Sequence, residues 1–143
     1  KLQEASCAGV RIDMIVRGIC CVRAEVPGKT ENLHIRSLVG RYLEHSRIYI
    51  FGQGERARYY IGSADWMTRS TLRRVEIAAP VTAPALKARL QHIFDTMLAD
   101  NCNARVQQPD GSYVRRMPGA DAVDCQAQFY EEAYQANVHS SLK

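Results

Sequence analysis

The chain has 143 residues, of which 46% are hydrophobic and 24% are charged, so it can bury a core and has the composition of a globular protein. Its formal net charge is +4, and arginine carries most of the basic excess. These values exclude a low-complexity chain, and no apolar run approaches the length that spans a bilayer. We therefore expect a single domain over residues 1–143. Because the chain opens with Lys1 in what reads as the middle of a helix, we expect this domain to be a fragment of a longer protein.

Five cysteines are present, at positions 7, 20, 21, 102 and 125. Their number is odd, the adjacent pair cannot form an unstrained disulfide with itself, and no Cys or His spacing matches a zinc site. The N-terminus also has no apolar segment typical of a signal peptide. Free thiols indicate a reducing compartment, so we expect a cytoplasmic protein.

The first part of the chain predicts strands separated by turns. In chain order we expect a helix end at 1–9, a buried strand at 10–18, a loop at 19–32, a strand within 33–42, a helical turn at 41–45, and a hairpin of strands 46–51 and 58–64. The hairpin rests on clean alternation of apolar and polar residues on either side of a glycine-containing turn.

The second part mixes helices with further strands. We expect a loop at 65–72, a third strand at 73–81, a helix at 83–101 with its apolar residues on one face, two short strands within 104–117 around a turn, and a helix at 127–138. The sum predicts an α/β (α+β) fold in which helices cover a mixed β-sheet.

Three polar residues flank the predicted hairpin in positions that a core does not require. His45 precedes the first strand and can bind a phosphate oxygen or transfer a proton, although a partly exposed histidine without a function is the simpler interpretation. Ser63 follows Gly62 at the end of the second strand, where a hydroxyl and a backbone N–H can bind an anion; a plain turn is the alternative. Asp65 can orient an imidazole or form an Asx-turn.

Two arginines are further candidates for phosphate contacts. Arg17 lies at the carboxyl end of the predicted buried strand, just before Gly18, at the edge of an α/β sheet where ligands bind. Arg74 alternates with apolar residues in the predicted third strand and shares a face with Glu76, a face that lines a cleft or is simply solvated. Guanidinium groups suit the recognition of phosphate oxygens, but arginine is also common on surfaces.

These residues together resemble a degenerate half of the phospholipase D signature, which is His-x-Lys, an aspartate, and then Gly-Ser-x-Asn. Here His45 and Arg47 form His-x-Arg, and Gly-Ser-x-Asp ends at Asp65. Arg47 thus replaces the lysine, Gly52 stands where the aspartate would fall, and Asp65 replaces the asparagine. These departures argue against hydrolytic chemistry by this half.

A closer resemblance is to the carboxyl-terminal part of bacterial polyphosphate kinases. It is carried by the stretches IVRGICC at 15–21, VPGKTEN at 26–32, RSLVGRYLEHSRIYIFG at 36–52, YIGSADWMTR at 60–69 and RRVEIAAPV at 73–81. The resemblance extends over nearly the whole chain and is weakest in the last 25 residues. It implies the second of two phospholipase D-like domains that form the catalytic core of that family.

The resemblance implies an enzyme that reversibly transfers the terminal phosphoryl group of ATP to inorganic polyphosphate, with ATP and ADP as substrates. It implies that Arg17 and His45 contact the nucleotide phosphates, that Arg74 adds a further contact, and that Asp65 holds the tautomer of His45. The phosphorylated histidine and the magnesium site of the family lie in the preceding domain, so we expect this fragment to bind no metal and to be inactive alone. The partners implied are polyphosphate, that preceding domain and further copies of the full-length protein, which is cytoplasmic or peripherally associated with a membrane.

Two alternatives remain open at this point. The chain can be a phosphodiesterase or nuclease half of the phospholipase D class, although the missing lysine counts against that function. It can also be a non-enzymatic polyanion-binding domain, which its positive charge permits. No recognition helix or ladder of aromatic residues is apparent, so we expect no specific nucleic acid partner.

Overall fold

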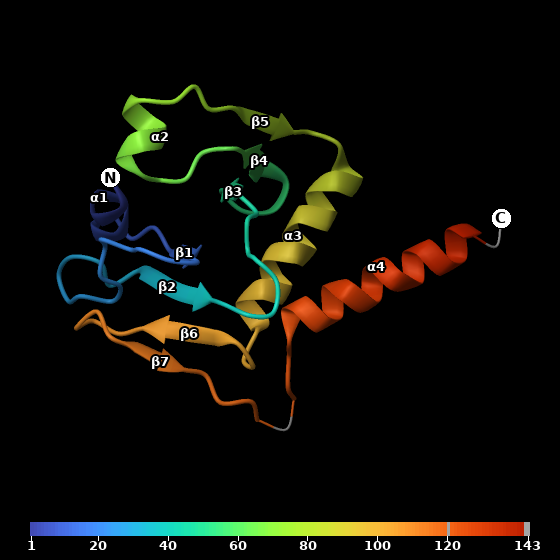
Figure 1. Ribbon diagram of the computed structural model, residues 1–143. Coiled ribbons are helices and arrows are strands. Elements are labelled where there is room, and N and C mark those ends of the chain that lie inside the picture. The colour runs from blue at the N-terminus through green and yellow to red at the C-terminus, as the bar shows by residue number, and fades with distance from the viewer. Residues whose placement is uncertain (120, 142–143) are drawn as a thin grey trace. The chain divides into compact units, whose positions relative to one another are not determined.

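The structure is a computed structural model that describes residues 1–119 and 121–141, and the chain divides into two compact units. The first unit consists of residues 1–44 together with the chain from Thr96 onward, and the second is His45–Asp95. Each unit contains its own β-sheet (Figure 1). The organisation as one domain over 1–143 stays a prediction.

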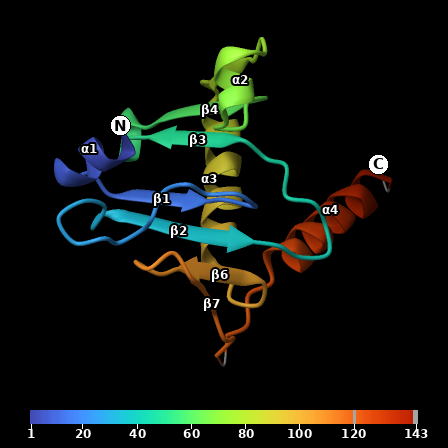
Figure 2. The same ribbon diagram turned by 60° about the vertical axis from the view of Figure 1, so that its left-hand side comes forward.

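The first unit is built on a four-stranded mixed sheet with the strand order β1-β2-β6-β7 (Figures 1 and 2). Its elements are α1 (Leu2–Cys7), β1 (Ile12–Ile15), β2 (Leu33–Leu38), β6 (Ala104–Gln107), β7 (Tyr113–Arg115) and α4 (Cys125–Ser141). β1 and β2 are parallel, and the other neighbours are antiparallel. The predicted strands at 10–18 and within 33–42 and 104–117, and the helix at 127–138, are confirmed.

The core of the first unit lies under β2, whose apolar residues alternate as predicted. Leu33 and Ile35 are fully buried together with Ala24 from the preceding loop. Partly buried hydrophobic side chains from β1 and the following loop pack around them: Ile12, Met14, Val16, Cys20 and Val22. This packing fixes the parallel pair β1–β2 and the edge at which both strands end.

The second unit is built on a three-stranded antiparallel sheet with the order β3-β4-β5. Its elements are β3 (Ile48–Phe51), the 3-10 helix η1 (Gly54–Arg56), β4 (Arg58–Gly62), α2 (Thr68–Leu72), β5 (Ala78–Val81) and α3 (Pro84–Ala99). The second unit ends at Asp95, so the last four residues of α3 belong to the first unit. The predicted hairpin and the long helix are confirmed. α3 contacts β4, since Tyr59 Oη donates to Gln91 Oε1 at 2.8 Å.

Four finer expectations were wrong, while the mixed α/β fold flanked by helices is confirmed. The strands form two sheets rather than one. No helical turn forms at 41–45, because Gln126 binds the backbone of Tyr42 in a non-helical conformation. The third strand begins only at Ala78 and faces β4 with Pro80 opposite Tyr60, while the predicted loop at 65–72 contains α2.

Candidate functional site

The hairpin register brings the two halves of the His-x-Arg and Gly-Ser-x-Asp pattern together within the second unit. Ile48 pairs with Ile61, and Gly62 N donates to the carbonyl of Arg47 at 3.0 Å. Because side chains two apart on extended backbone lie on one side, His45 and Arg47 share a side of the chain. Arg47 therefore lies opposite Gly62, and Asp65 follows three residues later.

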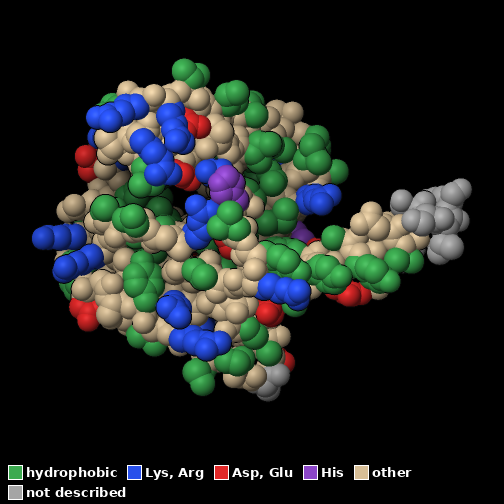
Figure 3. All heavy atoms as spheres, viewed as in Figure 1, with side chains coloured by type: hydrophobic (Ala, Val, Ile, Leu, Met, Phe, Trp, Pro, Cys, Tyr) green, Lys and Arg blue, Asp and Glu red, His purple; other side chains and the backbone are tan. Residues whose placement is uncertain are grey.

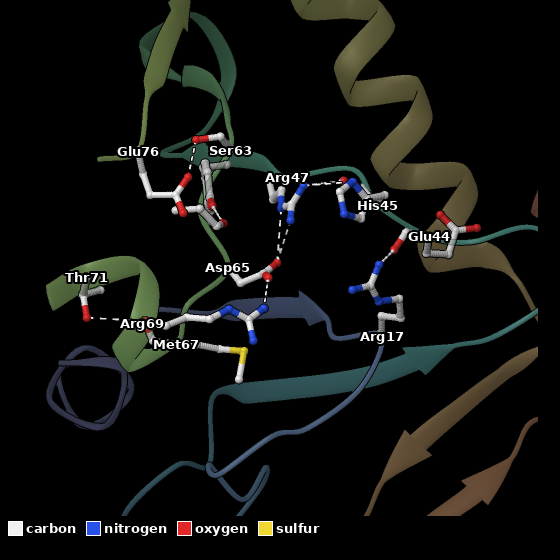
Figure 4. A network of polar contacts seen from close by, with 12 residues as sticks. Arg17, Glu44, His45, Arg47, Ser63, Asp65, Met67, Arg69, Thr71 and Glu76 are labelled. Carbon is white, nitrogen blue, oxygen red and sulfur yellow. Dashed lines mark hydrogen bonds and ion pairs between the residues drawn. The ribbon is translucent and has the colours of Figure 1, made fainter. Parts of the chain in front are cut away.

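Asp65 is the centre of a polar network in which two arginines hold its carboxylate (Figure 4). Oδ1 accepts from Arg47 Nε at 3.2 Å and from Arg47 Nη2 at 2.9 Å, and Oδ2 accepts from Arg69 Nη2 at 2.7 Å. The hydrogen bonds from Arg47, and then those from Arg69, lower the pKa of Asp65 below its ordinary value. The carboxylate is thus ionised at neutral pH.

The direct contact expected between Asp65 and the His45 ring is not formed. Both carboxylate oxygens are engaged by arginine, and Arg47 lies between the aspartate and the histidine (Figure 4). Arg47 Nη1 is 3.0 Å from His45 Nδ1 and 3.3 Å from the His45 carbonyl oxygen. Among the described residues, Asp65 is therefore linked to His45 through Arg47. The correction has a physical reason, because a guanidinium offers the carboxylate stronger, charge-assisted hydrogen bonds than an imidazole N–H does.

Ser63 also differs from the expectation of a free phosphate donor. Its hydroxyl donates to Glu76 Oε2 at 2.5 Å and accepts from the Ile77 N–H at 3.0 Å, while its own N–H donates to the Ile77 carbonyl. Both donors of Ser63 are therefore in use, and the carboxylate beside them repels an anion. Packing favours glycine at position 62, since a Cβ there would lie 3.0 Å from the Tyr49 ring and 3.2 Å from the Ile77 carbonyl oxygen.

Arg17 lies in the first unit, two residues beyond the end of β1. The carboxyl ends of β1 and β2 meet at one edge because the two strands are parallel. Arg17 is exposed, and its Nη1 donates to the backbone carbonyl of Glu44 at 2.6 Å (Figure 4). Among the described residues no partner binds the remaining N–H groups of this guanidinium, so they are available to an anion.

The segment that leads from β2 to His45 is held by Gln126, at the start of α4. Gln126 Oε1 accepts from Tyr42 N at 2.8 Å, and its Nε2 donates to the Tyr42 carbonyl at 2.8 Å and to Glu44 Oε1 at 2.5 Å. The Gln126 side chain is buried. Arg17 and Gln126 together fix the backbone up to Glu44, the residue that immediately precedes His45.

Arg74 lies outside any strand, in the connection between α2 and β5. The expected alternation with Glu76 on one face of a strand is wrong, because β5 begins only at Ala78. The Arg74 side chain is exposed, and within residues 1–119 and 121–141 no hydrogen bond or ion pair engages it. It is thus free to bind an anion, but its position is set by a loop.

Sequence reasoning missed the roles of Arg47, Arg69 and Gln126. Arg47 was recognised only as the substitute for a lysine. Arg69 contacts Asp65 because the two residues are four positions apart, and the prediction of a loop at 65–72 gave no reason to expect this helical spacing. Gln126 gave no signal at all in the sequence.

Over the described part of the chain, no group of three or more His, Cys, Asp or Glu side chains is placed to hold a metal ion, and no helix is long and apolar enough to cross a membrane.

Comparison with known proteins matches residues 1–128 to the family described as polyphosphate kinase C-terminal domain 2. A polyphosphate kinase of Bacillus anthracis is 46% identical over 136 residues, which cover 94% of this chain and 19% of that protein. One from Synechocystis sp. is 54% identical over 119 residues, covering 83% of this chain and 16% of that protein.

A solved structure agrees with these sequence matches. The crystal structure of the polyphosphate kinase from Porphyromonas gingivalis matches with a TM-score of 0.87 and 38% identity, covering 94% of this chain and 21% of that one. The resemblance inferred from the sequence motifs and the phospholipase D-like fold are thereby confirmed. The chain spans about a fifth of the length of the relatives that it matches. It belongs to the polyphosphate kinase C-terminal domain 2 family.

Proposed function

We propose that this chain forms the carboxyl-terminal part of the catalytic core of an enzyme that reversibly transfers the terminal phosphoryl group of ATP to inorganic polyphosphate. The observation that carries the proposal is the match of residues 1–128 to the family, together with relatives named polyphosphate kinase at 46% and 54% identity. The comparisons do not favour a nuclease half or a non-enzymatic polyanion-binding domain.

Arg17 and His45 are the residues to which we assign contacts with the nucleotide phosphates. Phosphoryl transfer spreads negative charge over the equatorial oxygens, so catalysis consists mostly of positioning and of electrostatic stabilisation. Arg17 has free guanidinium N–H groups, and the exposed His45 ring has its Nε2 without a partner among the described residues. Both can donate hydrogen bonds to phosphate oxygens, and Arg74 can add a third cation.

Binding of the polyphosphate chain is supported by how the charges divide between the units. Residues 45–95 contain eight Lys and Arg against four Asp and Glu, whereas the first unit contains eleven of each. The net charge of +4 therefore falls on the second unit. Figure 3 shows Lys and Arg side chains, in blue, exposed on the visible face. A basic surface attracts a dense polyanion over distances that depend on ionic strength.

We assign no magnesium ligand to this chain, and the phosphorylated histidine that the family resemblance implies belongs to the preceding phospholipase D-like domain. The complete active site then needs that domain, so we propose that the 143-residue chain alone transfers no phosphoryl group. Cytoplasmic location, peripheral membrane association and self-assembly of the full-length enzyme are part of the same proposal.

The test is phosphoryl transfer between ATP and polyphosphate by the full-length enzyme that contains this chain. Arg17→Ala and His45→Ala should each lower turnover by about 10²-fold or more, since each removes a group that stabilises the transferred phosphoryl. Arg105→Ala is the matched control, because Arg105 is exposed and lies on β6 in the first unit, outside the site. Wild-type turnover in both site variants, with the fold intact, would contradict the assignment.

A further inference from the structure

We propose that Arg47 is a positioning residue whose guanidinium fixes the His45 imidazole in the tautomer with its proton on Nε2, and that Asp65 holds Arg47 in place for this role. The catalytic consequence of this inference rests on the proposed function of His45. The tautomer itself is a property of the folded chain and can be measured without a substrate.

The first step is the contact between the two side chains. Arg47 Nη1 lies 3.0 Å from His45 Nδ1, which is hydrogen-bond distance (Figure 4). Arginine remains protonated in proteins, and its side chain has five N–H donors and no acceptor. The Nδ1 atom must therefore accept. A neutral imidazole that accepts at Nδ1 carries its proton on Nε2.

The second step is that Arg47 is itself held rigidly. Its Nε and Nη2 both donate to Asp65 Oδ1, and its Nη1 also approaches the His45 carbonyl. Arg69 restrains the other carboxylate oxygen of Asp65. The Arg47 side chain is 19% exposed and that of Asp65 26% exposed, so solvent competes with this pair less than with a surface ion pair. The guanidinium plane is thus fixed before any ligand arrives.

The third step concerns two of the three departures from the phospholipase D signature, those at Arg47 and Asp65. Arginine stands at the lysine position and aspartate at the asparagine position, and the structure joins these two substitutes in an ion pair at 2.9 Å. The hairpin register places Arg47 opposite Gly62 and so close to Asp65. The two departures therefore belong together: the arginine requires the carboxylate, and the carboxylate directs the arginine towards His45.

The chemical consequence is a defined donor on an otherwise exposed ring. In the described part of the chain, Arg47 provides the side-chain partner of the His45 ring, and Nε2 has none. With its proton on Nε2, His45 presents an N–H to a phosphate oxygen. The other tautomer would direct a lone pair at that oxygen, and the two would repel each other. A wrong tautomer costs turnover even where the position of the ring is unchanged.

The first experiment measures the tautomer in the 143-residue chain. The chain has four histidines, so multiple-bond ¹H–¹⁵N spectra of histidine-labelled protein, recorded at a pH where the rings are neutral, can be assigned with His45→Gln. We expect one unprotonated Nδ1 and one protonated Nε2 for His45. Arg47→Lys, which keeps a cationic donor, should retain this pattern, whereas Arg47→Met should give averaged shifts for the two nitrogens. A protonated or averaged Nδ1 in the wild-type chain would overturn the inference.

The second experiment measures kinetics in the full-length enzyme. Arg47→Met should lower kcat by about 10-fold or more while the KM for ATP changes little, and Arg47→Lys should recover part of the loss. Arg105→Met removes the same charge from the first unit and serves as the control. If His45→Gln abolishes turnover but Arg47→Met does not lower kcat, the inference fails and the proposed function stands. If His45→Gln leaves turnover unchanged, the proposed role of His45 fails, whatever the tautomer.

Discussion

Gln126 binds both backbone polar groups of Tyr42: its Oε1 accepts from the Tyr42 N–H and its Nε2 donates to the Tyr42 carbonyl, each at 2.8 Å. One carboxamide thus replaces the two hydrogen bonds that a neighbouring strand would supply. The two residues are 84 positions apart in the sequence. This contact ties the start of α4 to the segment that ends at Glu44.

We expect Gln126→Ala to destabilise the chain by about 1–3 kcal/mol, because the buried carboxamide would no longer satisfy the Tyr42 amide and carbonyl. Urea denaturation measures the free energy of unfolding. Gln128→Ala is the matched control on the same helix, since it removes only an exposed i, i+4 hydrogen bond to Glu132, and it should cost about 0.5 kcal/mol or less. Equal effects of the two variants would contradict the role given to Gln126.

Gly40→Ala should disturb the same contact from the opposite side. A Cβ at this position would lie 2.5 Å from Gln126 Oε1 and 2.8 Å from its Cδ, so the carboxamide would have to leave Tyr42. We expect a loss of about 1–3 kcal/mol in the wild-type background. In the Gln126→Ala background the added methyl group meets no carboxamide, and the loss should largely disappear. Additive effects in this double-mutant cycle would show that the two positions are independent.

Asp100 should make the free energy of unfolding of the first unit depend on pH in the acid range. The carboxylate is fully buried, and it accepts backbone N–H groups from Cys102, Asn103 and Ala104 on Oδ1 and from Cys125 on Oδ2. Burial alone would raise the pKa of Asp100, but these hydrogen bonds outweigh burial and lower it. The stabilisation is therefore present above the unfolded-state pKa of about 3.9 and is lost as pH falls through the lower folded-state pKa.

Asp100→Asn tests this dependence. At neutral pH it should cost about 2–3 kcal/mol, because an amide cannot accept on both of its polar atoms. The difference in unfolding free energy between wild type and variant should narrow as pH falls below about 4. Asp121→Asn, an exposed change in the same unit, should show neither effect. A difference from wild type that is independent of pH would contradict the assignment.

Cys125 should be the least reactive of the five free thiols. It is fully buried, and burial together with the neighbouring Asp100 raises its thiol pKa. Because the thiolate is the reactive form, we expect iodoacetamide to modify exposed Cys21 at least about 10-fold faster in the folded chain. Mass spectrometry of timed digests measures both rates. The control is modification in urea, where Cys21 and Cys125 should react at similar rates. Equal rates for the two thiols in the folded chain would contradict the prediction.

Arg74 and Arg73 provide a matched pair for the phosphate assignment. Both side chains are exposed in the same connection between α2 and β5 and carry the same charge. If Arg74 contacts phosphate, Arg74→Ala should lower the turnover of the full-length enzyme by about 10-fold or more, and Arg73→Ala should not. Equal losses would indicate a diffuse contribution of positive charge, and equal retention of activity would remove Arg74 from the site.

The sequence predicted those parts of the fold that local pattern determines. Alternation identified β3 and β4, and helical periodicity identified α3, because both patterns record which face is buried. The prediction failed where a residue distant in the sequence determines the backbone conformation. Gln126 prevents the helical turn expected at 41–45, and no local sequence pattern reveals that contact. α2 was missed because a five-residue polar helix is too short to show a period.

The candidate site shows the same division. His45, Asp65 and Arg17 were identified by residue type and by their places beside predicted strands. The sequence did not predict that Asp65 contacts Arg47 and that Arg47 in turn contacts His45. These contacts depend on the hairpin register, which sets Arg47 opposite Gly62. The place of Ser63 after Gly62 at a strand end predicts a free donor, but local sequence does not reveal that Glu76, in the connection before β5, accepts from its hydroxyl.

Pro80 in β5 has a consequence for self-association. The Ser63 N–H donates to the Ile77 carbonyl, so the alternation of an antiparallel ladder turns residues 77, 79 and 81 towards β4 and residues 78 and 80 away from it. Proline therefore removes no hydrogen bond within the sheet. It removes an outward-facing N–H from the edge strand, where a strand of another molecule would otherwise pair. At its β5 edge the second unit thus carries its own protection against growth of the sheet into an aggregate.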